Sequence, residues 1–438
     1  MSSKGVDSVF WFRRDLRLDD NHGLYMALVE NKPVLPIFIF DTNILLDLLD
    51  RGDKRVQFIY QELTAINERL KKYDSAIHCF YGDPVQIFRK LHKEFDFKAL
   101  YANEDYEPYG QERDKQVALA MLADGVKLNL FKDHVLCRPG EVLKDNQTPY
   151  TIYTPYMKKW KEVVLSSKPG HFPSERLLDR FVKNIPKHNL DLKEIGFEEQ
   201  PAHYPSRTVT EEVIKHYSGT RNFPAQVKGT SHLGIHLRFG TISIRRLYHQ
   251  VESFETTFLN ELIWREFFIQ ILFFHPRVIH SSFKPAYDQI QWRNDPKEFK
   301  AWCTGKTGYA MVDAGMRELN ATGFMHNRVR MVTASFLCKH LLIDWRWGEA
   351  YFAGKLLDYD LASNNGNWQW AAGTGCDAAP YFRIFNPHEQ LKKFDPQLEY
   401  VLKWAPEYGE IKLPPLLVDH AEARARALAV YGQGLKSN

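Results

Sequence analysis

Apolar and polar positions alternate in two different ways along the chain, and the first is confined to about the first 130 residues. Short apolar runs rich in β-branched and aromatic residues predict strands, and the segments of helical period between them predict helices. Strands of this kind, separated by helices, are typical of a parallel, doubly wound sheet. The predicted strands are 8–12, 34–40, 76–81, 99–102 and 127–131, with helices near 22–31, 54–72, 84–95 and 110–123.

After residue 206 strand patterns are absent and the helical period dominates. Between the two regions lies a stretch in which prolines recur, which predicts a connector wrapped along the surface with a short helix of its own. We therefore expect an α/β domain over 1–133, a connector over 134–205 and an all-α domain over 206–438. The predicted helices of the last region are 209–218, 240–251, 255–274, 296–304, 309–320, 325–342, 346–354, 358–362 and 420–433.

Composition adds limits to this picture. A chain of 438 residues with 44% hydrophobic and 26% charged residues is typical of a globular protein of more than one domain. It has no apolar run of bilayer length, no signal peptide and only five scattered cysteines without a CxxC pair. We therefore expect a cytoplasmic protein without a membrane segment, disulfide framework or metal site. The net charge of +4 neither requires nor excludes nucleic acid.

Eight of the ten tryptophans lie beyond residue 260. This clustering fits either a large helical core or a set of stacking and electron-transfer groups. Two nucleotide-binding motifs are missing: no GxGxxG follows the first strand, and GKT at 305–307 lacks the preceding glycine of a phosphate loop. Any ligand of the first domain should be held by loop side chains, for example in 101–109.

The stretch 358–385, DYDLASNNGNWQWAAGTGCDAAPYFRIF, concentrates acids, amides, small residues and two tryptophans. Buried polar groups need partners, and small residues let the backbone approach a ligand closely. We therefore predict that this stretch binds a large planar cofactor and that Trp370 faces a second ligand.

Three further segments carry candidate chemistry. In LNELIWREFF, Glu261 and Trp264 share a helix face beside Arg265, which indicates a polar ligand or an ion pair. GTSHLG at 229–234 reads as a polar loop entering a helix, which suits a phosphate cradle or a simple cap.

In MHNRVRM, Asn327 and Met331 share a face suited to a flat, partly apolar ligand. Arg328 is placed to reach phosphate, and Arg330 to pair with a buried acid.

Taken together, the chain resembles the photolyase and cryptochrome family, and within it the class I cyclobutane pyrimidine dimer photolyases. The motifs that carry the resemblance cover nearly the whole chain: FWFRRDLRLDDN, GTSHLGIHLRFGTIS, LNELIWREFF, MHNRVRMVTASFLCKHLLIDWRWGEAYF and LLDYDLASNNGNWQWAAGTGCDAAPYFRIFNP. The resemblance implies an α/β antenna domain of Rossmann-like topology, followed by a helical domain that binds FAD, active as FADH⁻.

Residue by residue, the resemblance implies three sets of contacts. The FAD contacts are Tyr217, Thr230, Ser231, His232, Leu233, Gly234, Arg265, Arg330, Asp358, Tyr359, Asp360 and Asn364, with Arg330 pairing Asp358 and Asn364 at flavin N5. The electron-transfer residues are Trp292, Trp345 and Trp368. The contacts to DNA and the lesion are Arg221, Glu261, Trp264, Asn327, Arg328, Met331, Trp370 and Arg383, and the set expected to act in the reaction is Glu261, Asn327, Met331 and Asn364.

The implied activity is light-driven repair of pyrimidine dimers in DNA, by electron donation from FADH⁻ to a flipped-out dimer. A cryptochrome-type blue-light receptor is the alternative from another class, and a six-four photolyase ranks behind both. The expected partner is damaged DNA, bound by a monomer. A second, antenna chromophore (methenyltetrahydrofolate, a deazaflavin or a second flavin) or none at all remains open.

Four positions depart from the family pattern. Gly234 and Gly373 stand where serine is usual, Asn367 where glycine is usual, and Cys376 where threonine is usual. These departures bear on FAD affinity and loop geometry rather than on the type of reaction.

Overall fold

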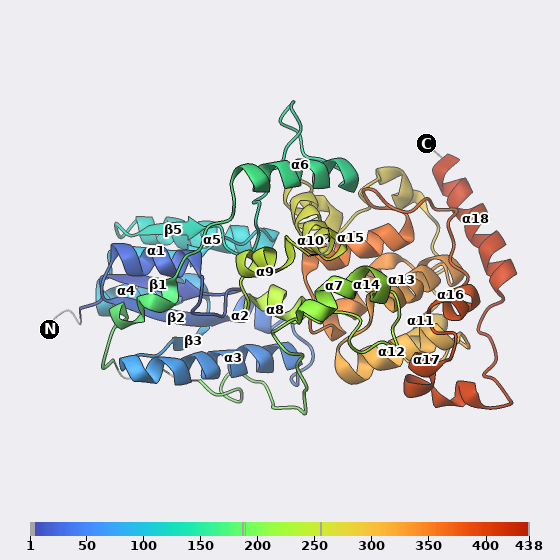
Figure 1. The fold of residues 1–438 in the computed structure, drawn as a ribbon, viewed down its shortest axis with the longest axis horizontal. Helices are drawn as coiled ribbons and strands as arrows, with labels where there is room; N and C mark the ends of the chain where they lie inside the picture. The colour runs from blue at the N-terminus through green and yellow to red at the C-terminus, as the bar shows by residue number, and fades with distance from the viewer. Residues whose placement is uncertain (1–4, 186–187, 189, 255, 437–438) are drawn as a thin grey trace. The chain divides into compact units, whose positions relative to one another are not determined.

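The computed structural model describes residues 5–185, 188, 190–254 and 256–436. The chain forms two compact units, neither of them continuous in sequence (Figure 1). Unit 1 comprises 1–141, 161–207 and 233–253, and unit 2 comprises 142–160, 208–232 and 254–438. Segments of the predicted connector thus belong to both units, and its predicted boundaries at 133 and 205 stay predictions.

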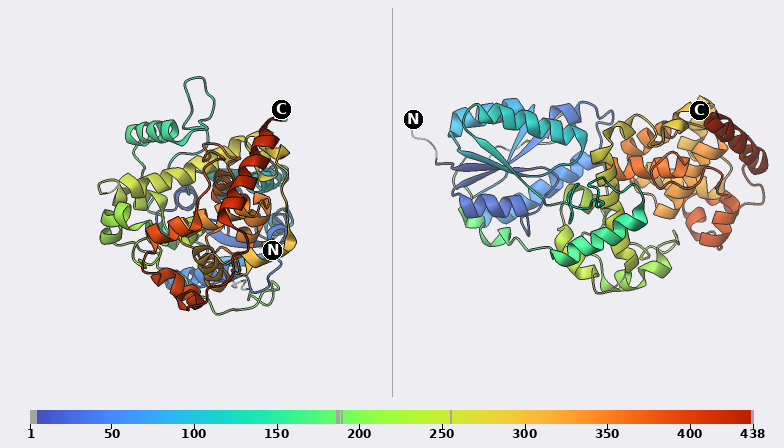
Figure 2. Two further views of the ribbon diagram at one scale, coloured as in Figure 1. Left: turned by 90° about the vertical axis from the view of Figure 1, so that its right-hand side faces the viewer. Right: turned by 90° about the horizontal axis from the view of Figure 1, so that it is seen from above.

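Unit 1 is built on a parallel sheet of five strands in the order β3-β2-β1-β4-β5. Every residue of β1 (Ser8–Phe12) and β2 (Val34–Asp41) is buried, as expected for central strands covered on both faces. The other strands are β3 (His78–Gly82), β4 (Ala99–Asn103) and β5 (Lys127–Phe131). In register, Ser8 of β1 lies beside Val34 and Ala99. The predicted doubly wound fold is confirmed, with helices on both faces of the sheet (Figure 2).

The helices of unit 1 follow the strands closely. They are α1 (His22–Glu30), α2 (Thr42–Leu45), α3 (Lys54–Leu70), α4 (Pro84–Phe95), α5 (Pro108–Leu122), α8 (Gly234–Phe239) and α9 (Ile244–Val251). Aspartate or asparagine side chains cap several of them, as Asp83 does for α4 by accepting from the Gln86 N–H at 3.0 Å. The core between sheet and helices includes Trp11, Phe88 and Phe97, all less than 3% exposed.

Unit 2 is helical, and all strands of the described chain lie before residue 132. Helix α6 (Tyr153–Ser166) runs from unit 2 into unit 1. The others are α7 (Glu211–Thr220), α10 (Thr256–Phe274), α11 (Pro296–Cys303), α12 (Ala310–Thr322), α13 (Asn327–Ser335), α14 (Trp345–Lys355), α15 (Leu361–Ala372), α16 (Pro387–Phe394), α17 (Glu399–Trp404) and α18 (His420–Lys436). A π-helical turn, η6 (Phe336–His340), continues α13.

One predicted helix is wrong. The sequence placed a helix at 358–362, whereas 358–360 precede α15, which runs from Leu361 to Ala372. Asp360 caps its start by accepting from the Ser363 N–H at 3.1 Å. Gly373 ends it at a φ of 89°, a left-handed conformation that favours glycine. Gly373, one of the four departures from the expected family pattern, therefore suits the helix end.

Among the described helices, none combines the length and apolar character needed to cross a bilayer.

Candidate functional site

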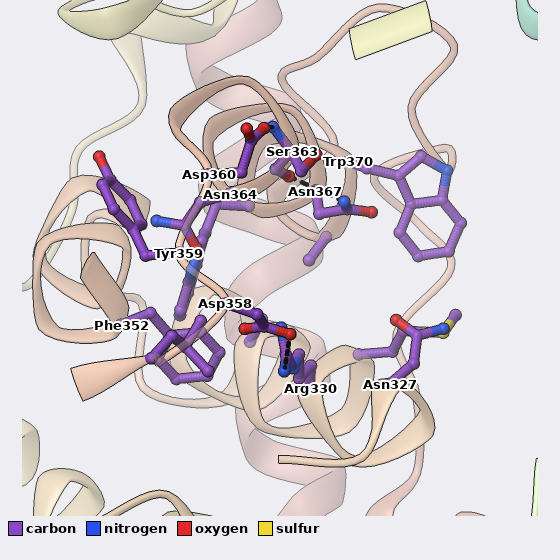
Figure 3. Close-up of a pocket in the computed structure, with 15 residues that line it drawn as sticks. Asn327, Arg330, Phe352, Asp358, Tyr359, Asp360, Ser363, Asn364, Asn367 and Trp370 are labelled. Atoms are coloured by element: carbon purple, nitrogen blue, oxygen red, sulfur yellow. Dashed lines mark hydrogen bonds and ion pairs between the residues drawn. The ribbon is translucent and has the colours of Figure 1, made fainter. Parts of the chain in front are cut away.

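A cavity in unit 2, which we call the central cavity, brings together most of the residues predicted from the segments 327–331 and 358–370 (Figure 3). Helices α13 and α15 and the loop before α15 supply most of its walls. The predicted residues that line it are Asn327, Arg330, Met331, Asp358, Tyr359, Asp360, Asn364, Trp368 and Trp370. The remaining lining residues are Ala334, Phe352, Leu356, Ser363, Asn367 and Ala371.

The predicted ion pair between Arg330 and Asp358 is confirmed. Arg330 Nη2 donates to Asp358 Oδ2 at 2.9 Å, and its Nε donates to the carbonyl oxygen of Met325 at 2.7 Å. Both side chains are at most one quarter exposed. The second carboxylate oxygen, Asp358 Oδ1, is buried and has no hydrogen-bond partner within the described chain. A buried acceptor without a partner is costly, so this atom calls for an N–H or O–H donor from a ligand.

Asn364, one turn into α15, has its amide orientation set by Glu349 of α14. Its Nδ2 donates to the Glu349 carbonyl oxygen at 3.1 Å and to Glu349 Oε1 at 2.8 Å. Burial raises the pKa of Glu349, and the hydrogen bond from Asn364 opposes that rise. Because both N–H groups of the Asn364 side-chain amide are engaged, its side-chain oxygen Oδ1 is left as the acceptor for a ligand.

Trp370 and Asn327 lie together on one side of the cavity, whereas Tyr359 and Phe352 lie on the other (Figure 3). Trp370 is partly exposed, and Met331 lines the same space. This side therefore offers an indole face, a thioether and an amide, which suit a flat group with polar edges. Asn364 is buried whereas Asn327 is exposed, so the cavity has a more buried part beside Asn364 and a more open part beside Asn327.

Glu261 and Trp264 of α10 are not among the residues described as lining the central cavity. Glu261 forms an ion pair with Arg221 of the α7 C-terminus, so the ion-pair alternative for this segment is present. Trp264 stacks on Tyr153 with ring centroids 3.6 Å apart and planes 5° apart. The structure therefore pairs both residues with protein groups, and a role toward a lesion stays a prediction for each.

Trp345 and Trp368 lie 1% and 2% exposed in one buried cluster, and the partly exposed Trp292 packs against it. Trp368 belongs to α15 and lines the central cavity, and Trp345 begins α14. Gly348, one turn along α14, permits this packing, since a Cβ there would collide with the Trp368 indole. Trp368 thus lines the cavity, and Trp292 is the least buried of the three, which suits their predicted role.

The segment 229–234 divides between the units. Thr230 and His232 line a second cavity of unit 2 together with Glu318, Phe324 and His326, among others. Burial lowers the pKa of His326 to about 3, helped by Arg330, so this histidine is neutral. Ser231 has a partner of its own, and Leu233 and Gly234 belong to unit 1, where α8 begins. The predicted entry of this loop into a helix is confirmed, but a phosphate cradle remains a prediction.

The other predicted contacts are placed as follows. Tyr217 has its ring edge-on to Phe258 at 5.0 Å, and Arg265 is partly buried with a protein partner. Arg328 Nη2 donates to Asn222 Oδ1 at 2.7 Å, and its guanidinium lies 4.3 Å over the Phe394 ring. Burial lowers the pKa of Arg328, and the nearby Arg221 lowers it further. Arg383 is exposed.

Comparison with known proteins decides the family. Residues 258–427 match the model described as the FAD binding domain of DNA photolyase, and 8–174 match the DNA photolyase model. The deoxyribodipyrimidine photo-lyase of Halobacterium salinarum is 34% identical over 97% of this chain and 98% of its own length. The chain belongs to the DNA photolyase family.

Solved photolyase structures agree. A class III photolyase from Agrobacterium tumefaciens superimposes with a TM-score of 0.86 at 33% identity, over 100% of this chain and 99% of that one. An archaeal photolyase from Sulfolobus tokodaii with two FAD molecules gives 0.85 at 33% identity, over 98% and 100%. The expectation of class I in particular stays a prediction.

The family implies a bound FAD, and the acceptor groups of the central cavity show whether its residues fit that cofactor. Asp358 Oδ1 and the Asn364 carbonyl oxygen both await donors, and a flavin ring carries N–H groups on its polar edge. These residues therefore fit the group. Asn365 and Gln369, in contrast, are structural: each donates to the Val278 carbonyl oxygen, at 3.0 and 2.9 Å.

In unit 1, where any ligand was expected to be held by loop side chains, the loops after β1 and β5 carry paired charges. Arg17 Nη2 donates to Asp133 Oδ2 at 2.6 Å, Asn103 Nδ2 donates to Asp15 Oδ2 at 2.6 Å, and Arg13 pairs with Asp114. The tyrosines of 101–109 are also bonded to protein carboxylates; Tyr109, for example, donates to Asp41 at 2.6 Å. These contacts do not distinguish among the antenna chromophores expected from the sequence.

Two residues that contact predicted site residues were missed from the sequence. Tyr153 lies in the proline-rich connector; its stacking on Trp264 and the hydrogen bond from its hydroxyl to the Asn260 carbonyl oxygen at 2.9 Å place it beside α10. Glu349 lies within the motif that ends in DWRWGEAYF, but no role was predicted for it. Its place on α14, four residues after Trp345, is the spacing that could have connected it with the site.

Proposed function

We propose that the protein is a deoxyribodipyrimidine photolyase that splits cyclobutane pyrimidine dimers in DNA by light-driven electron donation. The observation that carries the proposal is the two-sided central cavity. Its buried side presents Asp358 and Asn364 as acceptors, and its open side presents Trp370, Asn327 and Met331. One cavity would thus hold a flavin and a lesion close together.

On the buried side, Asp358 would accept from a flavin N–H while Arg330 neutralises its charge. Asn364, held by Glu349, would accept from the N5–H of the reduced ring. The bound FAD would supply the light absorption and the electron, as the cofactor does in flavoenzymes.

On the open side, the dimer must leave the duplex before it can reach a buried cavity, and damaged pairs cost less to unstack than normal ones. Trp370 would stack on the flipped bases, and Asn327 would read their polar edges. Glu261 and Arg221 would lie beside DNA as a preformed ion pair, with Arg221 available to exchange Glu261 for a phosphate.

We further propose that the protein acts as a cytoplasmic monomer. Its five cysteines all lie in the described part of the chain, where they are buried and form no disulfide, as is usual in a reducing compartment. Sedimentation of the FAD-loaded protein, alone and with a lesion-containing duplex, tests the monomer.

Lesion recognition in the dark tests the repair assignment. We expect the FAD-loaded protein to bind a duplex with one thymine dimer at least about a hundredfold more tightly than the undamaged duplex, because only the dimer fills the open side. Titration with both duplexes at one fixed salt concentration measures the ratio. Equal affinity would contradict repair and would favour the blue-light receptor.

A further inference from the structure

Trp292, the most exposed of the three predicted electron-transfer tryptophans, contacts Tyr431 of the C-terminal helix α18. Their ring centroids are 5.8 Å apart, with planes at 88°. Tyr431 is fully buried, and its hydroxyl donates to the Ala372 carbonyl oxygen at 2.9 Å. The partly exposed Trp292 indole is thus in contact with a buried aromatic ring that is held in place by a hydrogen bond.

A lysine lies against the same ring. Lys339, in the π-helical turn η6, is 1% exposed, and its Nζ lies 4.1 Å from the centroid of the Tyr431 ring. The Nζ also donates to the Tyr381 carbonyl oxygen at 3.2 Å. Because both distances are measured to the centre of the Tyr431 ring, the ammonium lies at most about 10 Å from the centre of the Trp292 indole.

No carboxylate neutralises Lys339 within the described chain. The groups that face it are the Tyr431 ring from α18, the Tyr381 carbonyl from the loop after α15, and Cys338 beside it. The negative charge of Asp344, at the start of α14, raises the pKa of Tyr431 and of Cys338. Asp344 itself forms an ion pair with Arg346 at 2.9 Å. On α18, Arg426 donates to the His340 carbonyl oxygen at 2.7 Å.

Burial lowers the pKa of Lys339 to about 7, and the neighbouring Cys338 opposes that shift. The side chain therefore changes charge near neutral pH, at a place where the low polarity of the surroundings makes each charge strongly felt.

We propose that Lys339 is a positioning residue for flavin photoreduction, in which its charge opposes electron donation by Trp292 and its neutral form permits it. The inference rests on the proposed function, because it requires the tryptophans to reduce light-excited oxidised FAD. One electron leaves the Trp292 indole and passes through Trp345 and Trp368 to FAD. The positive charge left on Trp292 persists until an external thiol reductant returns an electron, and a nearby ammonium raises its free energy.

Lys339 also has a purely structural interpretation, because its Nζ ties the Tyr381 segment to α18. That role predicts the same behaviour at every pH at which the protein is folded. Electrostatic control instead predicts a pH profile that disappears with the titratable group.

The test uses FAD-loaded protein and transient absorption of the oxidised tryptophan after a flash, from pH 6 to pH 8.5. In the wild type we expect its lifetime to lengthen about threefold to tenfold over this range as Lys339 loses its proton. In Lys339→Met the lifetime of the oxidised tryptophan should not change with pH and should be close to that of the wild type at high pH. Lys355 is an exposed lysine on α14, and Lys355→Met should keep the pH dependence of the wild type.

A flat wild-type profile, or the same profile in Lys339→Met, would overturn the proposal. If Lys339→Met fails to retain FAD, the pH profiles of the wild type and of Lys339→Arg decide between the two roles. Arginine stays charged, so Lys339→Arg should show the short lifetime of the low-pH wild type at every pH. Trp292→Phe separates the two claims: if it leaves the transient unchanged, the proposed electron path itself fails rather than the role of Lys339.

Stability gives a second readout that is independent of light. Because the pKa of Lys339 is lower in the folded protein than its usual 10.5, the unfolded chain binds the extra proton between about pH 7 and pH 10. The wild type should therefore gain stability relative to Lys339→Met as pH rises through this window. A difference between the two proteins that does not change with pH would contradict a buried, titrating lysine.

Discussion

At the scale of single residues, the site depends on atoms that have no protein partner. Asp358 illustrates this, since one oxygen is paired with Arg330 and the other is buried and unpaired. The sequence could predict the ion pair, because the motif resembles that of a known family. Residue pattern alone does not separate Asn364 from Asn365 and Gln369, and only the resemblance singled out Asn364. In the structure Asn365 and Gln369 bond to the Val278 carbonyl oxygen, whereas Asn364 bonds to Glu349.

Asp358→Asn should weaken FAD binding. The change removes the charge that pairs Arg330 and replaces one acceptor by a donor, and a hydrogen bond to a charged group contributes about 1.5–3 kcal/mol. We expect FAD affinity to fall by roughly tenfold to a hundredfold, measured by equilibrium dialysis of the apoprotein. Glu410→Gln, an exposed acid of the same unit, serves as the control and should bind FAD as the wild type does.

Trp370→Ala should separate the two sides of the cavity. Loss of the indole removes the stacking surface for the lesion, worth about 1–3 kcal/mol per base, while Asp358 and Asn364 stay in place. We expect weaker binding of dimer-containing DNA with nearly normal FAD content, and partial recovery in Trp370→Phe. A parallel loss of FAD would show that Trp370 supports the cofactor and not the lesion.

At the scale of elements, strands were easier to predict than the helix that matters most. The strands are short runs rich in apolar residues between turns, and their predicted positions agree with the structure to within about two residues. The predicted helix ends at 362, whereas α15 continues through SNNGN, a composition typical of turns. Tertiary contacts override that tendency: Gly366 lets α15 approach Phe268 of α10, and Asn365 bonds to the segment after α10.

Close packing between α14 and α15 predicts the effect of a single methyl group. Gly348→Ala should place a Cβ against the Trp368 indole and the Leu337 side chain, and overpacking of this kind costs about 1–3 kcal/mol. We expect a lower midpoint of chemical unfolding and slower photoreduction of oxidised FAD.

Gly354→Ala is the matched control on the same helix. Its added methyl would meet no atom within 4 Å, so the helix propensity of alanine should leave stability unchanged or raise it by up to about 1 kcal/mol. Equal loss of stability in both variants would contradict the packing explanation.

At the scale of the whole molecule, the two units could be predicted as fold classes, but their division could not. The segment 233–253 groups with the α/β unit although it lies inside the predicted helical domain, because its partners are formed by residues distant in sequence. Arg245, for example, donates to Asp20 Oδ2 at 3.1 Å and to Asp133 Oδ1 at 2.9 Å. Local pattern carries no record of such pairings, so the predicted boundaries followed the change from strand and helix patterns to helix patterns and the prolines between them.

Repair of a defined lesion tests the central claim most directly. Purified protein with reduced FAD is mixed with an oligonucleotide containing one thymine dimer, illuminated with blue light, and the restored thymines are counted against a dark control. If the protein is a dimer photolyase, we expect light-dependent restoration of two thymines per dimer over many turnovers. No restoration in the light, with reduced FAD bound and the lesion in place, would contradict it.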